Sequence, residues 1–297
     1  MAWWQAMRSR SLVPEVFATS VDGCKFVWRT FGEGPPAILL HGGHGSWRHW
    51  ARNVESLSRV RRLLVPDMPG FGESDASSFK DMVGFAGLLA KSIRQLPTGD
   101  DGVDLVGFSF GGLAAAHLAS SEIPALEVRS LALLGPAGHG GARRLASELV
   151  DWRRAEGPAA LADAMRHNLA AFMIADQDKI DDEALDIHTT ACQSTRFRSK
   201  AISRAGGLQK VISSFDGPLL MAWGEADVTV TPAEIPEIVS ASRTSADTRG
   251  SYSRPRVRVV PDAGHWVQYE AHQLVNELLL QFWQDTERRP AIARQGV

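Results

Sequence analysis

The chain has 297 residues, of which 44% are hydrophobic and 22% are charged, and its formal net charge is −2. These values are ordinary for a folded globular protein and exclude a collagen-like, low-complexity or highly charged disordered chain. The near-neutral charge and the scattered arginines argue against a nucleic-acid-binding or anionic-membrane surface.

Targeting signals and disulfides are not expected either. The first ten residues, MAWWQAMRSR, lack an apolar run followed by a cleavage site, and no stretch approaches the roughly 20 apolar residues of a membrane span. The two cysteines, Cys24 and Cys192, lie far apart and are expected to be unpaired thiols in a reducing compartment. We therefore expect a cytoplasmic protein.

The first half of the chain alternates predicted strands and helices. Apolar runs bounded by turn residues predict strands, and apolar residues spaced three or four apart predict helices. The predicted strands are 15–21, 25–31, 36–40, 62–66, 103–106 and 129–134. The predicted helices are 47–58, 81–96 and 113–119. This alternation is typical of a parallel sheet covered by helices on both faces.

The second half begins with a purely helical pattern. We predict helices at 142–155, 158–173, 181–195 and 200–213. Strands then resume at 218–223 and 256–260, with helices after Pro232 and at 274–283. We interpret 138–215 as a helical cap inserted between two parts of an α/β core, 1–137 and 216–297. Residues 240–254 are predicted to form an exposed loop, and those after about 287 a disordered tail.

Three chemically suitable residues follow predicted parallel strands, at the sheet edge where α/β proteins place their sites. Ser109 lies between Gly107 and Gly111 in a strand-turn-helix context, which is the G-x-S-x-G pattern of a nucleophile elbow. Asp227 follows the strand at 218–223, and His265 follows 256–260. A serine hydroxyl needs a neutral imidazole to accept its proton and a carboxylate to orient that imidazole. We therefore predict a Ser-His-Asp triad.

The sequence resembles the α/β-hydrolase superfamily over nearly its whole length, about residues 17–282. The resemblance rests on five motifs: His41-Gly42-Gly43, residues 67–74 (DMPGFGES), residues 107–112 (GFSFGG), Gly224-Glu225-Ala226-Asp227 and Gly264-His265. It implies an α/β-hydrolase fold, with a mostly parallel eight-stranded sheet and an inserted helical cap. It also implies Ser109 as nucleophile, His265 as general base and acid, Asp227 as orienting carboxylate, and the backbone N–H groups of Gly43 and Phe110 as oxyanion donors.

Within the superfamily, two segments look like the carbon–carbon bond hydrolases that act on ring meta-cleavage products. They are residues 266–270 (WVQYE) and Trp47 with residues 52–54 (RNV). Those enzymes hold a substrate carboxylate with a cap arginine, so the resemblance makes Arg196 and Arg198 candidates for that contact. The other expected substrate-binding residues are Gly42, His44, His49, Phe108 and Trp266. Phe108 and His49 stand where that family typically has asparagine, and this difference favours a plainer ester or thioester.

We expect a serine hydrolase that cleaves a small acyl substrate, either a carboxylic ester or an activated C–C bond of a ketone acid. No cofactor is expected, and no metal, because no carboxylate or cysteine is spaced with His41, His44 and His49 as a ligand set requires. The alternatives are a ligand receptor, or a cofactor-free oxygenase or perhydrolase on the same fold. The expected partner is the small acyl substrate, without nucleic acid or membrane and with a homodimer as one possible assembly.

Overall fold

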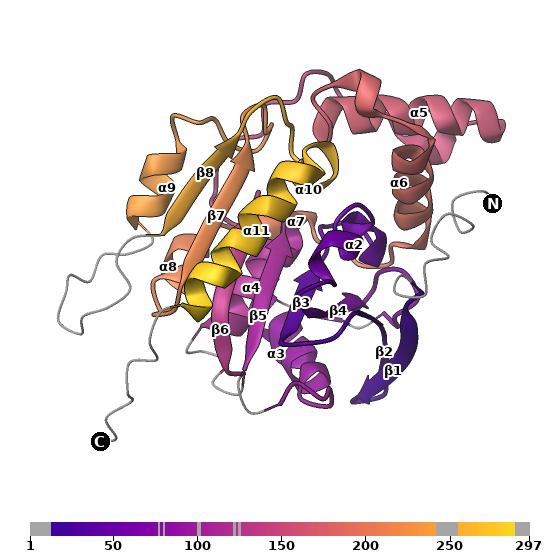
Figure 1. Cartoon of the computed structure of the whole chain (residues 1–297). Coiled ribbons are helices and arrows are strands. Elements are labelled where there is room, and N and C mark those ends of the chain that lie inside the picture. The colour runs from indigo at the N-terminus through magenta and orange to yellow at the C-terminus, as the bar shows by residue number, and fades with distance from the viewer. Residues whose placement is uncertain are drawn as a thin grey trace.

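The computed structural model describes residues 13–76, 78–79, 81–99, 102–120, 123, 126–241 and 255–288. Its strands are β1 Glu15–Val21, β2 Cys24–Phe31, β3 Pro36–Leu40, β4 Arg62–Asp67, β5 Val103–Phe108, β6 Val128–Leu134, β7 Leu219–Gly224 and β8 Arg256–Val260. They form one eight-stranded sheet in the order β1-β2-β4-β3-β5-β6-β7-β8 (Figure 1). The pairs β1–β2 and β2–β4 are antiparallel and all others are parallel, which confirms the predicted sheet.

The central strands are buried on both faces because their side chains alternate between two apolar cores. In β3, Ile38 and Leu40 belong to one core, whereas Leu39 belongs to the other. Leu105 and Val106 of β5 divide in the same way. Since successive strand residues point to opposite faces, a continuous apolar run is the pattern that such a doubly covered strand requires.

Helices cover both faces of the sheet. The first core includes apolar residues of α3 (Met82–Ile93), α4 (Phe110–Ala119), α8 (Leu208–Ile212) and α9 (Ile235–Ala241). The second includes residues of η1 (Trp47–Trp50), α2 (Val54–Leu57), α10 (Val267–Glu270) and α11 (His272–Glu287). The described part of the chain contains no helix that is both long enough and apolar enough to cross a membrane.

The segment between β6 and β7, which the structure describes throughout, contains helices and loops but no strand. Its elements are η2 (Trp152–Arg154), α5 (Gly157–Phe172), η3 (Gln177–Lys179), α6 (Asp182–Ser194), α7 (Lys200–Arg204) and α8. Figure 1 shows α5 and α6 packed together beyond one end of the sheet. We call residues 138–215 the cap segment.

The structure corrects two predicted cap helices. The helix predicted at 142–155 is wrong, since only Trp152–Arg154 forms a short 3₁₀ turn. The Asn168 side chain instead holds the extended chain by accepting from Val150 N at 2.8 Å and donating to Val150 O at 2.9 Å. The helix predicted at 200–213 is split into α7 and α8, because Gly206 and Gly207 take positive φ angles of 77° and 99°.

Other boundaries differ by smaller amounts. The helix predicted at 47–58 is two short pieces, η1 and α2, whereas α4 begins three residues earlier than predicted, directly after Ser109. Glu287 still belongs to α11. Most of the predicted loop, at 242–254, and the tail from residue 289 lie outside the described residues.

Candidate active site

Ser109 occupies a strained turn between β5 and α4. Its φ of 52° and ψ of −116° lie outside the regions that non-glycine residues normally occupy. The turn is also crowded, because a Cβ on Gly107 would lie 2.3 Å from Gly111 O, and one on Gly111 would lie 2.4 Å from His41 O. Only glycine at these two positions allows the backbones to approach so closely. The strain and crowding hold the Ser109 side chain at the carboxyl end of β5.

The three predicted triad residues meet at this sheet edge. His265 Nε2 lies 2.9 Å from Ser109 Oγ, and His265 Nδ1 lies 2.9 Å from Asp227 Oδ2. Asp227 and His265 are both buried, whereas Ser109 is partly exposed. The arrangement is a continuous hydrogen-bonded chain that ends at an accessible hydroxyl. Such a chain can remove the hydroxyl proton as the oxygen attacks an electrophile.

Hydrogen bonds keep the Asp227 carboxylate ionised and oriented. Its Oδ1 accepts from Thr229 N at 2.8 Å and from Thr229 Oγ1 at 2.7 Å. Burial by itself raises the pKa of Asp227, but the charge of His265 and the hydrogen bonds from His265 and Thr229 outweigh it and lower that pKa below its ordinary value. Gly135 makes room for the pair, since a Cβ there would lie 3.0 Å from Asp227 Oδ2.

Two buried histidines fix the loop that follows β3. Met68 N donates to His41 Nε2 at 2.9 Å, so the other ring nitrogen carries the proton and donates to Gly42 O at 2.8 Å. Gly42 N in turn donates to His49 Nδ1 at 3.2 Å. Burial lowers the pKa of both imidazoles, that of His49 strongly, so both are neutral at pH 7 and can accept these hydrogen bonds.

The expected oxyanion donors lie on either side of Ser109. Gly43 belongs to the loop fixed by His41 and His49, and Phe110 begins α4. Among the described residues, neither backbone N–H has a hydrogen-bond acceptor. Gly43 also touches the cap segment, because a Cβ on it would lie 2.5 Å from Ser199 Oγ and 3.8 Å from Phe110 Cβ. Two unpaired N–H groups beside a nucleophile are what an oxyanion hole requires.

Three residues that were expected to bind substrate, Phe108, His49 and Trp266, are buried beneath Ser109 and do not line its pocket. Phe108 is fully buried, with its ring centroid 5.1 Å from that of His265 and 5.5 Å from that of His49. Trp266 is also buried and donates from its indole N–H to His49 O at 3.2 Å. His49 therefore packs between Phe108 and Trp266 and supports the loop that follows β3 through its hydrogen bond with Gly42 N.

His44, in the same loop as Gly43, also lies near the cap segment. It has a positive φ of 52°, and its side chain is half-buried. Burial lowers the pKa of His44, and the nearby charges of Arg153, Arg143 and Lys200 lower it further. All three cations belong to the cap segment.

The structure does not bring Arg196 or Arg198 to Ser109. Arg196 is exposed and donates to the backbone oxygens of Ser194 at 2.9 Å and Gly72 at 3.1 Å, as well as to Ser74 O. Its guanidinium therefore fastens the cap segment to the loop after β4. Arg198 is exposed and does not line the pocket that contains Ser109. Neither arginine therefore lies where a substrate held at Ser109 would meet it.

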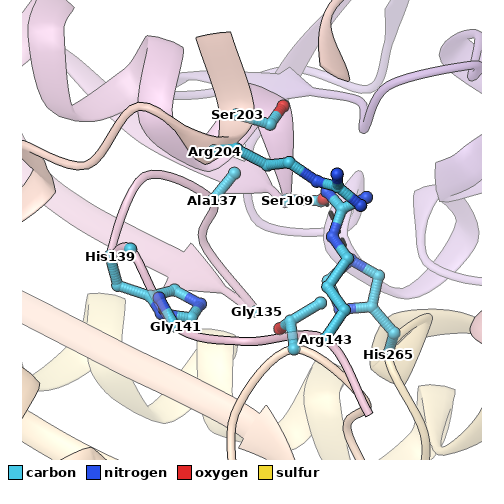
Figure 2. Close-up of a pocket in the computed structure, with 11 residues that line it drawn as sticks. Ser109, Gly135, Ala137, His139, Gly141, Arg143, Ser203, Arg204 and His265 are labelled. Atoms are coloured by element: carbon cyan, nitrogen blue, oxygen red, sulfur yellow. Dashed lines mark hydrogen bonds between the residues drawn. The ribbon is translucent and has the colours of Figure 1, made fainter. Parts of the chain in front are cut away.

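Two different arginines line the pocket that contains Ser109 and His265. They are Arg143, from the loop after β6, and Arg204, at the end of α7. Figure 2 shows both guanidinium groups reaching toward the Ser109 end of this pocket. Burial lowers the pKa of Arg143, and the charge of Arg204 lowers it further. Within the described residues neither guanidinium forms an ion pair with a carboxylate, although the charge of Asp227 acts on the pKa of Arg143 in the opposite direction to that of Arg204. The Arg143 guanidinium also lies over the Phe172 ring, 5.0 Å from the ring centroid.

Neither arginine was predicted as a site residue. The helices predicted at 142–155 and 200–213 would have placed Arg143 and Arg204 on helices of the cap. The signal that could have found Arg143 is the run Gly135-Pro136-Ala137-Gly138, which follows a parallel strand at the same edge as Ser109. His139, Ser203 and Thr229 also line the pocket. Among the described residues, no group of three or more His, Cys, Asp or Glu side chains could hold a metal ion, and both cysteines are free and buried.

Comparison with known proteins finds relatives among hydrolases and esterases. Over 273 aligned residues the chain is 29% identical to the 2-hydroxy-6-oxo-6-phenylhexa-2,4-dienoate hydrolase of Burkholderia cepacia, and the match covers 84% of this chain and 88% of that protein. A shorter match, 37% identical over 92 residues, is to the pimeloyl-acyl-carrier-protein methyl ester esterase of Vibrio campbellii and covers 31% of this chain and 34% of that protein.

Solved structures share the fold. A variant of the meta-cleavage product hydrolase CumD superposes with a TM-score of 0.68 at 21% identity, over 91% of this chain and 98% of that one. The sequence model of the Alpha/beta hydrolase family matches residues 37–278, which is most of the chain. The chain therefore belongs to the alpha/beta hydrolase family.

Proposed function

We propose that this chain is a serine hydrolase that cleaves a small acyl substrate bearing an acid group, through a covalent acyl-enzyme on Ser109. The observation that carries the proposal is the Asp227–His265–Ser109 hydrogen-bonded chain, which opens into a pocket lined by Arg143 and Arg204. Family membership supports hydrolysis in general. The serine mechanism and the substrate class are inferred from the site.

The first half-reaction follows from the hydrogen bonds. His265 accepts the Ser109 proton as Oγ attacks the substrate carbonyl, while Asp227 stabilises the imidazolium. The carbonyl oxygen becomes an anion, for which the N–H groups of Gly43 and Phe110 are the available donors. His265 then gives its proton to the departing group. In the second half-reaction His265 activates water, which releases the acyl group and restores Ser109.

The arginines favour a substrate whose departing half is an acid. The departing atom must lie within reach of His265 Nε2, because that nitrogen carries the proton it needs. Arg143 and Arg204 line the same pocket as His265, so a carboxylate attached to the departing half can approach both guanidinium groups. Planar guanidinium groups bind carboxylates through paired hydrogen bonds, and two such groups offset the cost of removing the anion from water.

Two bond types remain candidates. A C–C bond in a ketone acid fits the arginine pocket and the dienoate hydrolase that matches over 84% of the chain. An ester fits the floor beneath Ser109, where Phe108 is apolar and His49 Nδ1 already accepts a hydrogen bond from Gly42 N. Both reactions use the same acyl-enzyme, and they differ in the group that His265 must protonate.

A paired assay separates these bond types. One reaction uses p-nitrophenyl esters of increasing chain length, and the other uses a coloured 2-hydroxy-6-keto dienoate. Rapid loss of the dienoate with slow ester cleavage would establish the C–C reaction, and the opposite pattern would establish an esterase. Ser109→Ala should abolish turnover of either substrate and labelling by a fluorophosphonate while the fold persists. Retained turnover would refute the serine mechanism.

The acid-binding role is tested by Arg143→Gln and Arg204→Gln. Losing a charged hydrogen-bonding partner is worth about 1.5–3 kcal/mol, so each change should raise KM for acid substrates about 10- to 100-fold and spare neutral esters. Arg198→Gln is the matched control, because it removes the same charge from the same segment at an exposed position away from the pocket. Equal effects on acid and neutral substrates would assign the arginines a structural role.

A further inference from the structure

Glu270, at the end of α10, is a buried carboxylate whose partners are all backbone N–H groups. It is only 5% exposed. Its Oε2 accepts from Gly264 N at 2.7 Å and from Ala175 N at 3.1 Å, and its Oε1 accepts from Asp176 N at 2.8 Å. No arginine, lysine or histidine among the described residues forms an ion pair with it. A buried charge needs such donors, so these three bonds fix the carboxylate firmly.

The three donors come from two separate parts of the chain. Gly264 directly precedes His265, whereas Ala175 and Asp176 follow α5 in the cap segment. One side chain therefore joins the His265 loop to the cap segment. The catalytic chain in the proposed function does not use Glu270, and Glu270 belongs to neither apolar core.

Further contacts join the same two parts on the other side of His265. Trp266 N donates to Met173 O at 2.7 Å, and the Phe172 ring meets the His265 ring edge to face with centroids 5.2 Å apart. Gly264 lies so close to the cap segment that a Cβ on it would be 2.8 Å from Ala175 N. The residues before and after His265 are thus both tied to residues 172–176.

We propose that Glu270 is a positioning residue, which holds the His265 imidazole in line between Asp227 and Ser109 by fastening its loop to the cap segment. The inference rests on the proposed function, because it assumes that His265 transfers the proton. Its consequence is that the cap segment and the imidazole move together. A displacement of about 1 Å in a catalytic group can cost about 100-fold in rate, so this attachment has a direct kinetic effect.

Two substitutions remove different numbers of the hydrogen bonds that Glu270 accepts. In Glu270→Gln the amide oxygen can still accept from Gly264 and Ala175, whereas the NH₂ group faces Asp176 N and loses one bond. Glu270→Ala loses all three bonds. The matched control is Asp104→Asn, because Asp104 is another buried carboxylate, 2% exposed, which lies near the start of β5, at the opposite end of that strand from Ser109.

The experiment measures the rate at which a fluorophosphonate labels Ser109, kcat and KM for an ester, and the downfield proton NMR signal of the Nδ1–H shared by His265 and Asp227. Thermal unfolding of each variant is recorded alongside. Glu270→Ala should lower the labelling rate and kcat about 100-fold, leave KM close to wild type and broaden or remove the NMR signal. Glu270→Gln should lower the labelling rate and kcat about tenfold and keep the NMR signal. Asp104→Asn should lose stability but keep the labelling rate and the signal.

The proposal is overturned if a folded Glu270→Ala labels as fast as Asp104→Asn and keeps the wild-type signal, because Glu270 would then only support the fold. If Glu270→Ala does not fold, Glu270→Gln decides, and a labelling rate equal to wild type overturns the proposal. Failure of the proposed function would look different. It would appear as turnover by Ser109→Ala, whatever the Glu270 variants do.

Discussion

His188 should make the protein sensitive to acid. This histidine lies on α6, and its ring nitrogens are 3.7 and 3.9 Å from Cys192 Sγ, one turn further along the helix. Burial lowers the pKa of His188 to about 4, and the charge of His44 in the loop after β3 lowers it as well. The imidazole is therefore neutral in the folded protein at every pH above about 4.

The sign of the effect follows from proton binding. In the unfolded chain a histidine binds its proton near pH 6.5, whereas folded His188 does so only near pH 4. Between these values the unfolded state holds more protons, so the free energy of unfolding falls as the pH falls. Each pKa unit corresponds to about 1.4 kcal/mol. Because the side chain keeps some exposure, we expect up to about 2 kcal/mol of lost stability at pH 4.5.

The perturbation is His188→Gln, which keeps a polar side chain of similar length and removes the titration. Urea unfolding of both proteins at pH 8 and pH 4.5 gives four free energies of unfolding. The difference at pH 8 reports altered packing alone, and it serves as the internal baseline. The variant should lose about 2 kcal/mol less than wild type between the two pH values. If both proteins lose the same stability, His188 is not held neutral by its surroundings and the reasoning is wrong.

Three further substitutions test the site and the sheet that carries it. Asp227→Asn should lower kcat about 10⁴-fold with the fold intact, because the amide favours the wrong imidazole tautomer; a loss below about tenfold in an ester assay would contradict its orienting role. Gly135→Ala should reduce activity far more than thermal stability, because the added Cβ would lie 3.0 Å from Asp227 Oδ2. The backbone there also has a positive φ of 48°. A wild-type kcat in this variant would argue against the crowding. Asp104→Asn should cost about 3–5 kcal/mol in urea unfolding, because it removes the buried charge that pairs with buried Arg61 at 2.9 Å and half-buried Arg129 at 2.7 Å. An unchanged urea midpoint would refute that estimate.

The sheet and the proximity of Ser109, Asp227 and His265 could be predicted from the sequence, because strands follow from short apolar runs and the three residues each follow such a run. The predicted strands agree with the observed ones to within two residues at either end, and the signal is strongest for the central strands, whose burial on both faces requires mostly apolar side chains. Ser109, Asp227 and His265 each follow a parallel strand, and parallel strands end at one edge. The positions of these three residues after parallel strands were therefore enough to predict that they lie close together.

The cap segment was harder to predict because its conformation depends on pairings that no local pattern records. Residues around Val150 look helical in sequence, but the Asn168 side chain 18 positions later binds both backbone groups of Val150 and keeps the chain extended. Arg196 likewise looked suited to a carboxylate, yet backbone oxygens of Gly72 and Ser74 take its hydrogen bonds. In both cases a tertiary contact overrode the local preference.

Under the proposed function, this division separates the residues of the reaction from those that select the substrate. Ser109, His265 and Asp227 follow strands of the sheet, which fixes their positions relative to one another. The residues that reach over them, Arg143 and Arg204, come from the segment between β6 and β7, where single contacts decide the course of the chain. Glu270 joins that same segment to the His265 loop through three hydrogen bonds. If Glu270 positions His265 as we propose, a change in the cap segment that alters substrate choice must also preserve the alignment of His265.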